Sequence, residues 1–316
     1  MHNVEPIQPK DDAFHGSKRV AAEWWYFDGV FSDNYSFHIG IRTFSRKKQG
    51  MALIFFELYH EDTIIFEKKK RFRFNQFHTS TDFPLVKIND KQVMGFDVIK
   101  YKENQEWIYR VTVSIDDCSA DLSFSAITEG FKIETKKESW TVALPKARIQ
   151  GEISYDGKTV SVDGIGYHDH NWNYRPSSVL TYGKGWYWGK IKSQSFNIVW
   201  ANVLKRSGLQ DLLAIVNVDG NGFYAVNPEN IVFNANNFIR YKRRKIPTFF
   251  TFNFRDTVKK KQIEASLSID VKHIHYSKVF IASYWRYHVG IKGKIVVDDT
   301  VENIDNLQIM EYLSMV

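Results

Sequence analysis

Apolar and polar residues alternate at every second position over much of this 316-residue chain. The alternation is clear over residues 35–41, 71–77, 107–113 and 250–254, which are rich in Val, Ile, Phe and Tyr. A period of two places successive side chains on opposite faces of a β-strand, so one face of each strand is expected to be buried. Convincing amphipathic helices of ten or more residues are absent from the pattern. The sequence predicts an all-β sandwich or barrel, and a barrel with an aromatic interior can hold one apolar ligand.

Two stretches of the chain resemble each other at a constant spacing of 142 residues. They are residues 151–170 and 293–312. The identical positions are Gly151/Gly293, Ile153/Ile295, Asp156/Asp298 and Asp163/Asp305. A second echo, in the same order, pairs the aromatic residues 25–27 with 186–188. Together they indicate two similar β units, each opening with an aromatic strand and closing with a hairpin that ends in an acid.

The two predicted units meet near residues 172–182. The loop at 173–178 contains Asn, Pro and Ser, which are typical of a break between strands. We therefore place the first domain at residues 1–177 and the second at 178–316. A chain of this length fits two ordinary domains.

The chain carries a net charge of +7, which by itself would favour an acidic partner. The positive residues come in short runs at 46–48, 68–71, 241–245 and 259–261, next to apolar stretches. Lysine in such places is typical of hairpin ends and edge strands, where it blocks pairing with another chain. We therefore expect solvated loops and no nucleic-acid partner, and a peripheral contact with a membrane stays open as an alternative.

Cysteine content and hydropathy restrict the class of protein further. Cys118 is the single cysteine, which excludes an intrachain disulfide framework and a cysteine-cluster metal site. The first ten residues are polar and lack the apolar core of a signal peptide. No apolar run approaches the ~20 residues of a membrane-spanning helix. We expect a cytoplasmic protein.

An acidic residue directly precedes a run of four aromatic residues. If the segment is a strand, Glu23 and Trp25 face one side, and Trp24 and Tyr26 face the other. A carboxyl group packed against indole loses solvation, which favours its neutral, proton-donating form. Glu23 is therefore a candidate catalytic acid. The alternative is a surface glutamate at the mouth of an ordinary aromatic core.

A second motif concentrates histidine and aspartate near the middle of the chain. On a strand, His168 and His170 share one face and Asp169 points to the other. Two histidines at this spacing could ligate a metal, with His38 and Glu57 as further ligands that nothing in the sequence selects. We favour a metal-free polar cluster in which His170 and Asp169 serve in acid–base chemistry or as structural anchors.

Three motifs together resemble one known family. They are the Glu-Trp-Trp-Tyr-Phe segment at 23–27, the Gly-x-Gly-Tyr-x-Asp-His-Asn-Trp segment at 164–172, and the terminal pair Glu311-Tyr312. The chain resembles the carotenoid 1,2-hydratases, or hydroxyneurosporene synthases, a group that includes AttH-like proteins and, more distantly, fungal Diels–Alderases. The resemblance implies two lipocalin-like antiparallel β-barrel domains packed together, with an apolar pocket in or between them. It also implies a hydrophobic isoprenoid, carotenoid or polyene substrate, no metal and no cofactor.

The resemblance also implies a mechanism. A carboxylic acid protonates a terminal alkene, aromatic faces stabilise the carbocation, and water captures it. Asp169, His170 and Trp172 match the central motif of the family. The hydratases are expected to carry a Tyr-x-Asp on a following strand, and the counterpart here ends in Asn202, which cannot protonate an alkene. The proton would then come from Glu23 or Asp169. The aromatic residues expected to contact the substrate are Trp24, Trp25, Tyr167, Trp172, Trp186, Trp188 and Trp200.

Three classes of function remain open at this point. An isoprenoid hydratase or cyclase needs a buried acid aimed at an aromatic pocket. A pericyclase of the Diels–Alderase kind needs only positioning and hydrogen bonds, so Asn202 would be no obstacle to it. A lipid or isoprenoid carrier needs the pocket without any acid that reaches the ligand. A fold or family does not by itself decide among them.

Overall fold

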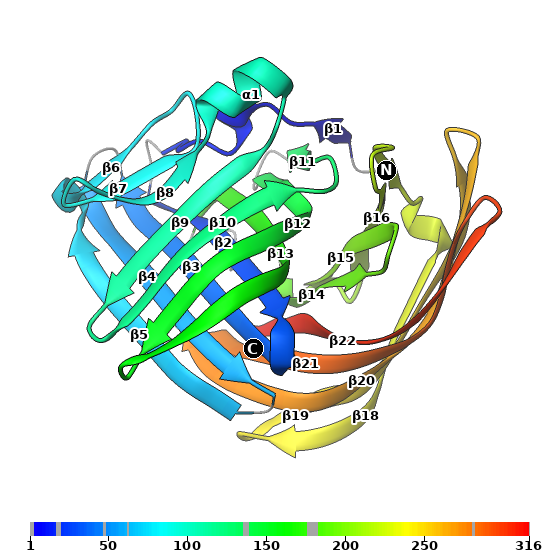
Figure 1. Cartoon of the computed structure of the whole chain (residues 1–316). Helices are drawn as coiled ribbons and strands as arrows, with labels where there is room; N and C mark the ends of the chain where they lie inside the picture. Colours follow the sequence, from blue (N-terminus) through cyan, green and yellow to red (C-terminus); the bar gives the residue numbers. More distant parts are fainter. Residues whose placement is uncertain are drawn as a thin grey trace. The chain divides into compact units, whose positions relative to one another are not determined.

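The chain folds into two units built almost wholly from β-strands (Figure 1). The computed structural model describes residues 3–16, 20–46, 49–61, 63–134, 139–175, 183–279 and 282–315. Within this part of the chain, residues 3–175 form the first unit and residues 183–315 form the second. The predicted boundary between residues 177 and 178 lies outside the described residues. Each unit contains one antiparallel sheet, so the predicted all-β fold class is confirmed.

The described residues of the first unit form a 13-stranded sheet. Its main path runs β5-β4-β3-β2-β13-β12-β10-β9-β8-β7-β6, while β1 pairs with β11, and β11 pairs with β12. The strands are β1 (Val4–Pro6), β2 (Ala21–Phe31), β3 (Tyr35–Arg46), β4 (Gln49–His60), β5 (Thr63–Arg73), β6 (Phe77–Thr79), β7 (Leu85–Ile88), β8 (Lys91–Phe96), β9 (Ile108–Ile115), β10 (Cys118–Ala126), β11 (Phe131–Glu134), β12 (Ser139–Tyr155) and β13 (Lys158–Tyr174). The helical segments are η1 (Pro9–Asp11), η2 (Ser32–Asn34), η3 (Phe74–Gln76) and α1 (Val98–Asn104).

The sheet of the first unit curls into a nearly closed barrel (Figure 1). Side chains of β5, at one edge, reach strands on the far side of the sheet. Lys68 forms an ion pair of 2.8 Å with Asp117 in the β9–β10 turn, and the rings of Phe66 and Tyr155 lie 5.7 Å apart. The enclosed face carries one apolar core rich in Phe, Ile and Val. This closure gives the unit an interior in which polar groups are shielded from water.

The described residues of the second unit form a nine-stranded sheet in the order β17-β16-β15-β14-β22-β21-β20-β19-β18. The sheet curls over a second apolar core, and the ring of Trp200 on β15 lies 5.1 Å from that of Phe233 on β18. The elements are β14 (Gly183–Lys192), β15 (Phe196–Lys205), β16 (Gln210–Val218), β17 (Phe223–Ala225), η4 (Pro228–Asn230), β18 (Ile231–Tyr241), β19 (Arg244–Val258), β20 (Lys261–Val279), β21 (Ala282–Val297) and β22 (Thr300–Ser314).

The two sheets follow the same strand order. When β14 is matched with β2 and β22 with β13, the remaining strands of the second sheet fall in line with β3–β5, β8–β10 and β12 of the first. The repeated hairpin has the same register in both units, because Gly151 pairs with Val162 and Gly293 pairs with Ile304, 142 residues later. Gly151 and Gly293 share a backbone φ of +142° and +141°, a region that glycine tolerates and other residues rarely adopt. The sequence repeat therefore reflects a structural repeat.

Two local predictions need correction. The alternating segment 71–77 is not one strand, because β5 ends at Arg73 and the turn η3 follows before β6. The amide oxygen of Gln76 accepts a hydrogen bond from the Arg73 backbone N–H and stabilises this turn. The match between the aromatic segments 25–27 and 186–188 is shifted by one residue. His170 pairs with Trp25, and its counterpart Tyr312 pairs with Tyr187 and not with Trp186.

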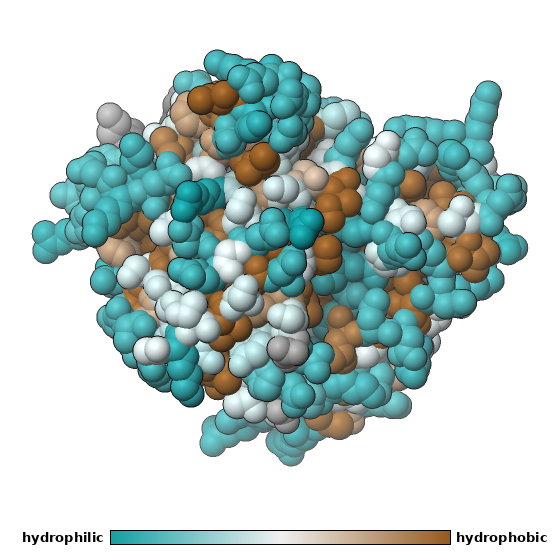
Figure 2. Space-filling model, in the orientation of Figure 1, coloured by the Kyte–Doolittle hydropathy of each residue, from teal (hydrophilic) through white to brown (hydrophobic). Residues whose placement is uncertain are grey.

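The outer surface agrees with the charge analysis. On the face shown in Figure 2, hydrophilic residues predominate and apolar ones lie among them. The basic run at 68–71 lies on the edge strand β5, and the runs at 241–245 and 259–261 cover the β18–β19 and β19–β20 turns. The run at 46–48 extends outside the described residues. No helix in the described ranges is long and apolar enough to cross a membrane.

Candidate functional site

Two neighbouring strands of the first unit carry both sequence motifs. In the antiparallel pair of β2 and β13, Trp25 lies opposite His170 and Phe27 lies opposite His168. Trp25 and Phe27 belong to the apolar core, so this face of the two strands points into the barrel. His168 and His170 are therefore held inside the first unit, where neither side chain is exposed to solvent.

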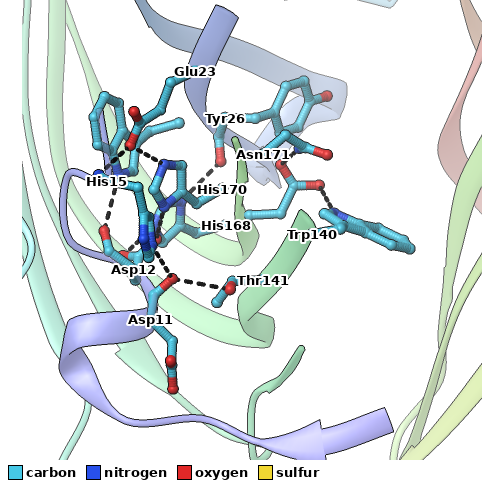
Figure 3. Close-up of polar contacts among 12 residues, drawn as sticks. Asp11, Asp12, His15, Glu23, Tyr26, Trp140, Thr141, His168, His170 and Asn171 are labelled. Carbon is cyan, nitrogen blue, oxygen red and sulfur yellow. Dashed lines mark hydrogen bonds and ion pairs between the residues drawn. The ribbon is translucent and has the colours of Figure 1, made fainter. Parts of the chain in front are cut away.

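A carboxylate from the N-terminal segment connects the two histidines. Asp12, which follows η1, lies 2.9 Å from His168 Nε2 through its Oδ2 and 3.4 Å from His170 Nδ1 through its Oδ1 (Figure 3). The Tyr109 hydroxyl donates to Oδ2 of Asp12 at 2.7 Å. The backbone carbonyl of Asp12 accepts a hydrogen bond of 3.0 Å from the Trp25 indole. Asp12 is completely buried, so these partners replace the water that its charge requires.

Glu23 holds the other side of His170. Its Oε1 lies 3.0 Å from His170 Nε2 and accepts a second hydrogen bond of 2.8 Å from the His15 backbone N–H. Its Oε2 accepts a bond of 2.9 Å from the Gly16 backbone N–H. Glu23 is 4% exposed, so it lies within the cluster and not at its surface. Both of its oxygens are occupied as acceptors, which suits Glu23 to orient His170 and to balance its charge.

Aromatic rings stack on the imidazoles of the cluster. Trp25 lies against His170 with ring centroids 4.4 Å apart, and Phe27 lies against His168 at 3.8 Å. The exposed His15 stacks on Trp172 at 4.0 Å with nearly parallel planes. Face-to-face contact with an aromatic ring stabilises a cationic imidazolium. The stacking also fixes the orientation of each ring nitrogen.

The environment determines which groups carry charge. Burial alone would lower the pKa of His170, but its contacts with Asp12 and Glu23 outweigh burial and raise the pKa to about 9. Burial alone would raise the pKa of Asp12, but the facing histidines outweigh it and hold that pKa well below its usual range. Desolvation, followed by the charge of His170, lowers the pKa of His15. At neutral pH, His170 is therefore a buried imidazolium between two carboxylates, and His15 is neutral.

Two complementary atoms at the centre of the cluster lack hydrogen-bond partners among the described residues. They are Asp12 Oδ1 and His170 Nδ1, which face each other at 3.4 Å without the geometry of a hydrogen bond. A buried donor and a buried acceptor that remain unpaired are costly, by about 1–3 kcal/mol each. A hydroxyl group or a water molecule could accept from the imidazolium and donate to the carboxylate at this point.

Asp169 lies on the opposite face of β13 and does not join this cluster. Its carboxylate accepts hydrogen bonds from the Trp140 indole at 2.9 Å, the Tyr167 hydroxyl at 2.7 Å and the Asn171 amide at 3.2 Å. The expectation that Asp169 and His170 form one polar cluster is therefore not met in this structure. Strand alternation separates them.

The other residues considered from the sequence are dispersed. Trp25 and Trp172 belong to the cluster, whereas Trp24 and Tyr167 lie on the outer faces of β2 and β13. In the second unit, Trp200 and Asn202 face the interior, while Trp186 and Trp188 alternate to the other face of β14.

The metal-ligand set suggested by the sequence does not assemble. His38 Nδ1 lies 3.0 Å from Glu57 Oε2, on the face of the sheet away from the two interior histidines. Within the described ranges, no group of three or more His, Cys, Asp and Glu residues is arranged to hold a metal ion. The nitrogens of His168 face a carboxylate and the Tyr26 backbone carbonyl.

Sequence reasoning missed Asp12, His15 and Tyr109. The first two lie in the segment before β2, which has no strand pattern, and Tyr109 is one of many aromatic residues on alternating strands. The only available signal was the pair of adjacent aspartates at positions 11 and 12 beside Pro9, which is typical of a short helical turn.

No family model matches the chain. The quinolone epoxide rearrangement protein asqO of Emericella nidulans is 30% identical over 77 residues, which is 24% of this chain and 20% of the relative. The quinolone epoxide rearrangement protein penF of Penicillium thymicola is 26% identical over 78 residues, 25% of this chain and 21% of the relative. The match thus spans about a fifth of the length of these curated relatives.

Solved structures match over nearly the whole chain. An AttH-type protein of Nitrosomonas europaea superposes with a TM-score of 0.66 at 13% identity, covering 98% of this chain and 97% of the other. CghA with Sch210972 gives 0.62 at 9%, covering 93% and 88%. Kievitone hydratase of Nectria haematococca gives 0.60 at 10%, covering 98% and 93%. This chain therefore shares the fold of AttH-type proteins, CghA and kievitone hydratase.

Proposed function

We propose that this protein is an enzyme that rearranges, hydrates or cyclises a small hydrophobic molecule by acid–base catalysis, with His170 as the proton donor. The observation that carries the proposal is a buried imidazole held between Asp12 and Glu23 and stacked on Trp25, whose Nδ1 faces Asp12 Oδ1 at 3.4 Å without forming a hydrogen bond. Titratable groups whose pKa values are displaced by burial and charge are typical of catalytic sites.

The strength of this acid favours one kind of substrate. A group with a pKa of about 9 is a weak donor, and protonating the carbon of an isolated alkene requires a much stronger one. An oxygen that gains negative charge as its bond to carbon breaks is a better match. We therefore favour an oxygenated substrate, such as an epoxide, a carbonyl compound or an alcohol on an isoprenoid or polyene skeleton, over a bare alkene.

For the opening of an epoxide, each proton that His170 donates is returned to it. His170 donates the proton on Nδ1 to the epoxide oxygen while the C–O bond breaks, and positive charge develops on carbon near the aromatic rings. Migration of a neighbouring group followed by return of a proton to Nδ1 gives an isomer. Capture by water gives a diol once the bound water has returned its extra proton to Nδ1. Asp12 and Glu23 keep the imidazole aligned throughout.

The comparisons support this direction without deciding the substrate. Two partial relatives are named for epoxide rearrangement, and one protein of the same fold is named a hydratase. Both reactions need a proton placed on oxygen or carbon in an apolar site. A carotenoid substrate remains a prediction from the sequence resemblance.

Conversion of defined probes tests the proposal. The full chain is incubated with trans-stilbene oxide and, separately, with the acyclic carotenoid lycopene, and the products are examined by mass spectrometry. We expect stilbene oxide to give an isomer or a diol, and the rate to fall ~10²–10⁴-fold in His170→Asn. His78→Asn is the matched control, because His78 is an exposed histidine of the same unit.

The outcomes separate the classes of function. Equal conversion by His170→Asn and the parent chain would contradict the proposed donor. A water added to lycopene, lost in His170→Asn, would restore the carotenoid hydratase hypothesis. Tight retention of both probes without conversion would instead favour the carrier hypothesis.

A further inference from the structure

A continuous row of side chains crosses the interior face of the second unit at one level. Register places Asn202 beside Tyr187, Tyr187 beside Tyr312, and Tyr312 beside Trp285. Paired residues on adjacent strands share a face, and Tyr187 and Trp285 belong to the apolar core. We call these the interior row; it comprises Leu212, Asn202, Tyr187, Tyr312, Trp285 and Tyr276 on β16, β15, β14, β22, β21 and β20.

The central rings of the interior row form an ordered stack. Tyr187 stacks on Tyr312 with centroids 4.4 Å apart, and Tyr312 stacks on Trp285 at 5.0 Å. On the next level, the indole of Trp200 lies across Gly189, where an added Cβ would come within 2.8 Å of the ring. The stacked rings therefore cover one another's faces. The members Leu212, Tyr312 and Tyr276 are only partly buried, so the row reaches the surface of the unit.

Several polar atoms on this face have no hydrogen-bond partner among the described residues. They are the Trp285 indole N–H, the Tyr287 hydroxyl and the Asn202 side-chain oxygen. All three side chains have no exposed surface. Each unpaired group would gain from a ligand that supplies the missing partner. Two of the three can donate, so the matching ligand needs an acceptor.

The interior row carries no charged residue. Arg286 on β21 and Glu311 on β22 point to the opposite face, where they lie 3.2 Å apart. Burial raises the pKa values of Tyr187 and Tyr287 well above their usual range, so both remain neutral hydroxyls at physiological pH. A charged ligand would lose its hydration here without gaining a countercharge.

We infer that the interior row of the second unit binds a neutral, flat, apolar small molecule that carries a carbonyl-type hydrogen-bond acceptor. The partly buried members Leu212, Tyr312 and Tyr276 contact the rings or conjugated chain of the ligand. The Trp285 and Tyr287 donors engage its acceptor. The site is independent of the chemistry proposed for His170, because it lies in the other unit.

Benzophenone is a suitable probe, because it is a neutral aromatic ketone that forms covalent bonds with nearby C–H groups on irradiation. Calorimetry on the full chain is expected to show saturable binding that Trp285→Phe and Tyr287→Phe each weaken about tenfold, the loss of one hydrogen bond. Diphenylmethane, which lacks the carbonyl, should bind more weakly and equally to parent and variants. Tyr224→Phe is the matched control, since that hydroxyl bonds the Asn221 carbonyl away from the row.

Photolabelling of the unmodified chain needs no variant and tests the location directly. The label should map by peptide mass spectrometry to β14, β21 and β22. Labelling confined to the first unit, or an absence of saturable binding, would overturn the inference. So would equal affinity of parent and both variants for benzophenone.

Discussion

The two units place a stacked pair of rings at the same point of the same scaffold. In the first unit, Trp25 on β2 stacks on His170 of β13 at 4.4 Å, and in the second, Tyr187 on β14 stacks on Tyr312 of β22 at the same separation. Their surroundings differ completely. The first pair is enclosed by two carboxylates, and the second lies among uncharged groups.

The difference originates largely outside the repeated strands. Asp12 and the backbone N–H groups of His15 and Gly16 come from the segment before β2. This segment adds one carboxylate and two backbone donors to the groups that the strands supply. A repeated sheet can thus be given an ionic or a neutral interior by one short segment. The two interiors thus differ through local additions to a common frame.

Removing the buried carboxylate should have the largest effect. Asp12→Asn leaves His170 with one countercharge and His168 facing a neutral group, so we expect a loss of about 3–5 kcal/mol in the free energy of unfolding. The pKa of His170 should fall as well, which NMR titration would detect. Tyr312→Phe, at the position of the second unit that corresponds to His170, should cost only about 1 kcal/mol. Equal losses would remove the distinction between the two interiors.

Between pH 6.5 and 9, the stability of the first unit should depend on pH through His170. The folded pKa of His170 is about 9, above its ordinary 6.5, so its contribution is complete below pH 6.5 and disappears as the pH rises through 9. The shift is worth about 3 kcal/mol. The pKa of Asp12 is lowered, so its contribution is present above its ordinary 3.8 and is lost as the pH falls further.

Amide hydrogen exchange can follow the two units separately. After correction for the intrinsic rate, protection of β2 and β13 should decrease between pH 6.5 and 9. Protection of β14 and β22 should not, because burial raises the pKa of Tyr187 well above this range. A parallel decrease in both units would contradict the assignment of His170 as the linked group.

Glycine substitutions should reveal what the units share. An added Cβ at Gly151 or at Gly293 would come within 2.0 Å of a backbone oxygen, and both have strongly positive φ. We expect Gly151→Ala and Gly293→Ala to cost roughly 2–4 kcal/mol each in urea denaturation. Gly157→Ala, with no atom within 4 Å, should cost about 1 kcal/mol. A large inequality between the first two would show that the repeat does not extend to the conformation of this glycine.

The strand architecture was predictable because alternation and turn residues are local properties. The burial pattern of β9 follows its sequence position by position, and the 142-residue repeat survives as identical register. The prediction for segment 71–77 was wrong, because the Arg73 backbone N–H donates a hydrogen bond to the Gln76 side chain and stabilises a turn that periodicity does not record.

The candidate site was only half predictable. Glu23, Trp25, His168 and His170 could be found because they occupy one face of two strands. Asp12 could not, because its place depends on how a segment without periodicity crosses the end of the barrel to reach Tyr109, 97 positions away in sequence. Asp169 was predicted to join the cluster because it is adjacent to His170 in sequence. Its side chain points to the opposite face because successive residues of a strand alternate.

The smallest expected difference in the free energy of unfolding is that between Trp25→Phe and Trp285→Phe, and it compares the two interiors most directly. Trp25→Phe leaves the buried carbonyl of Asp12 without its indole donor and should cost about 2–3 kcal/mol in urea denaturation. Trp285→Phe removes an indole N–H that has no partner among the described residues, so only the smaller ring volume is lost, about 1 kcal/mol. If Trp285→Phe costs as much as Trp25→Phe, the Trp285 N–H is already satisfied within the chain. The interior row would then have one donor fewer to offer a ligand, and the neutral interior would be an ordinary core.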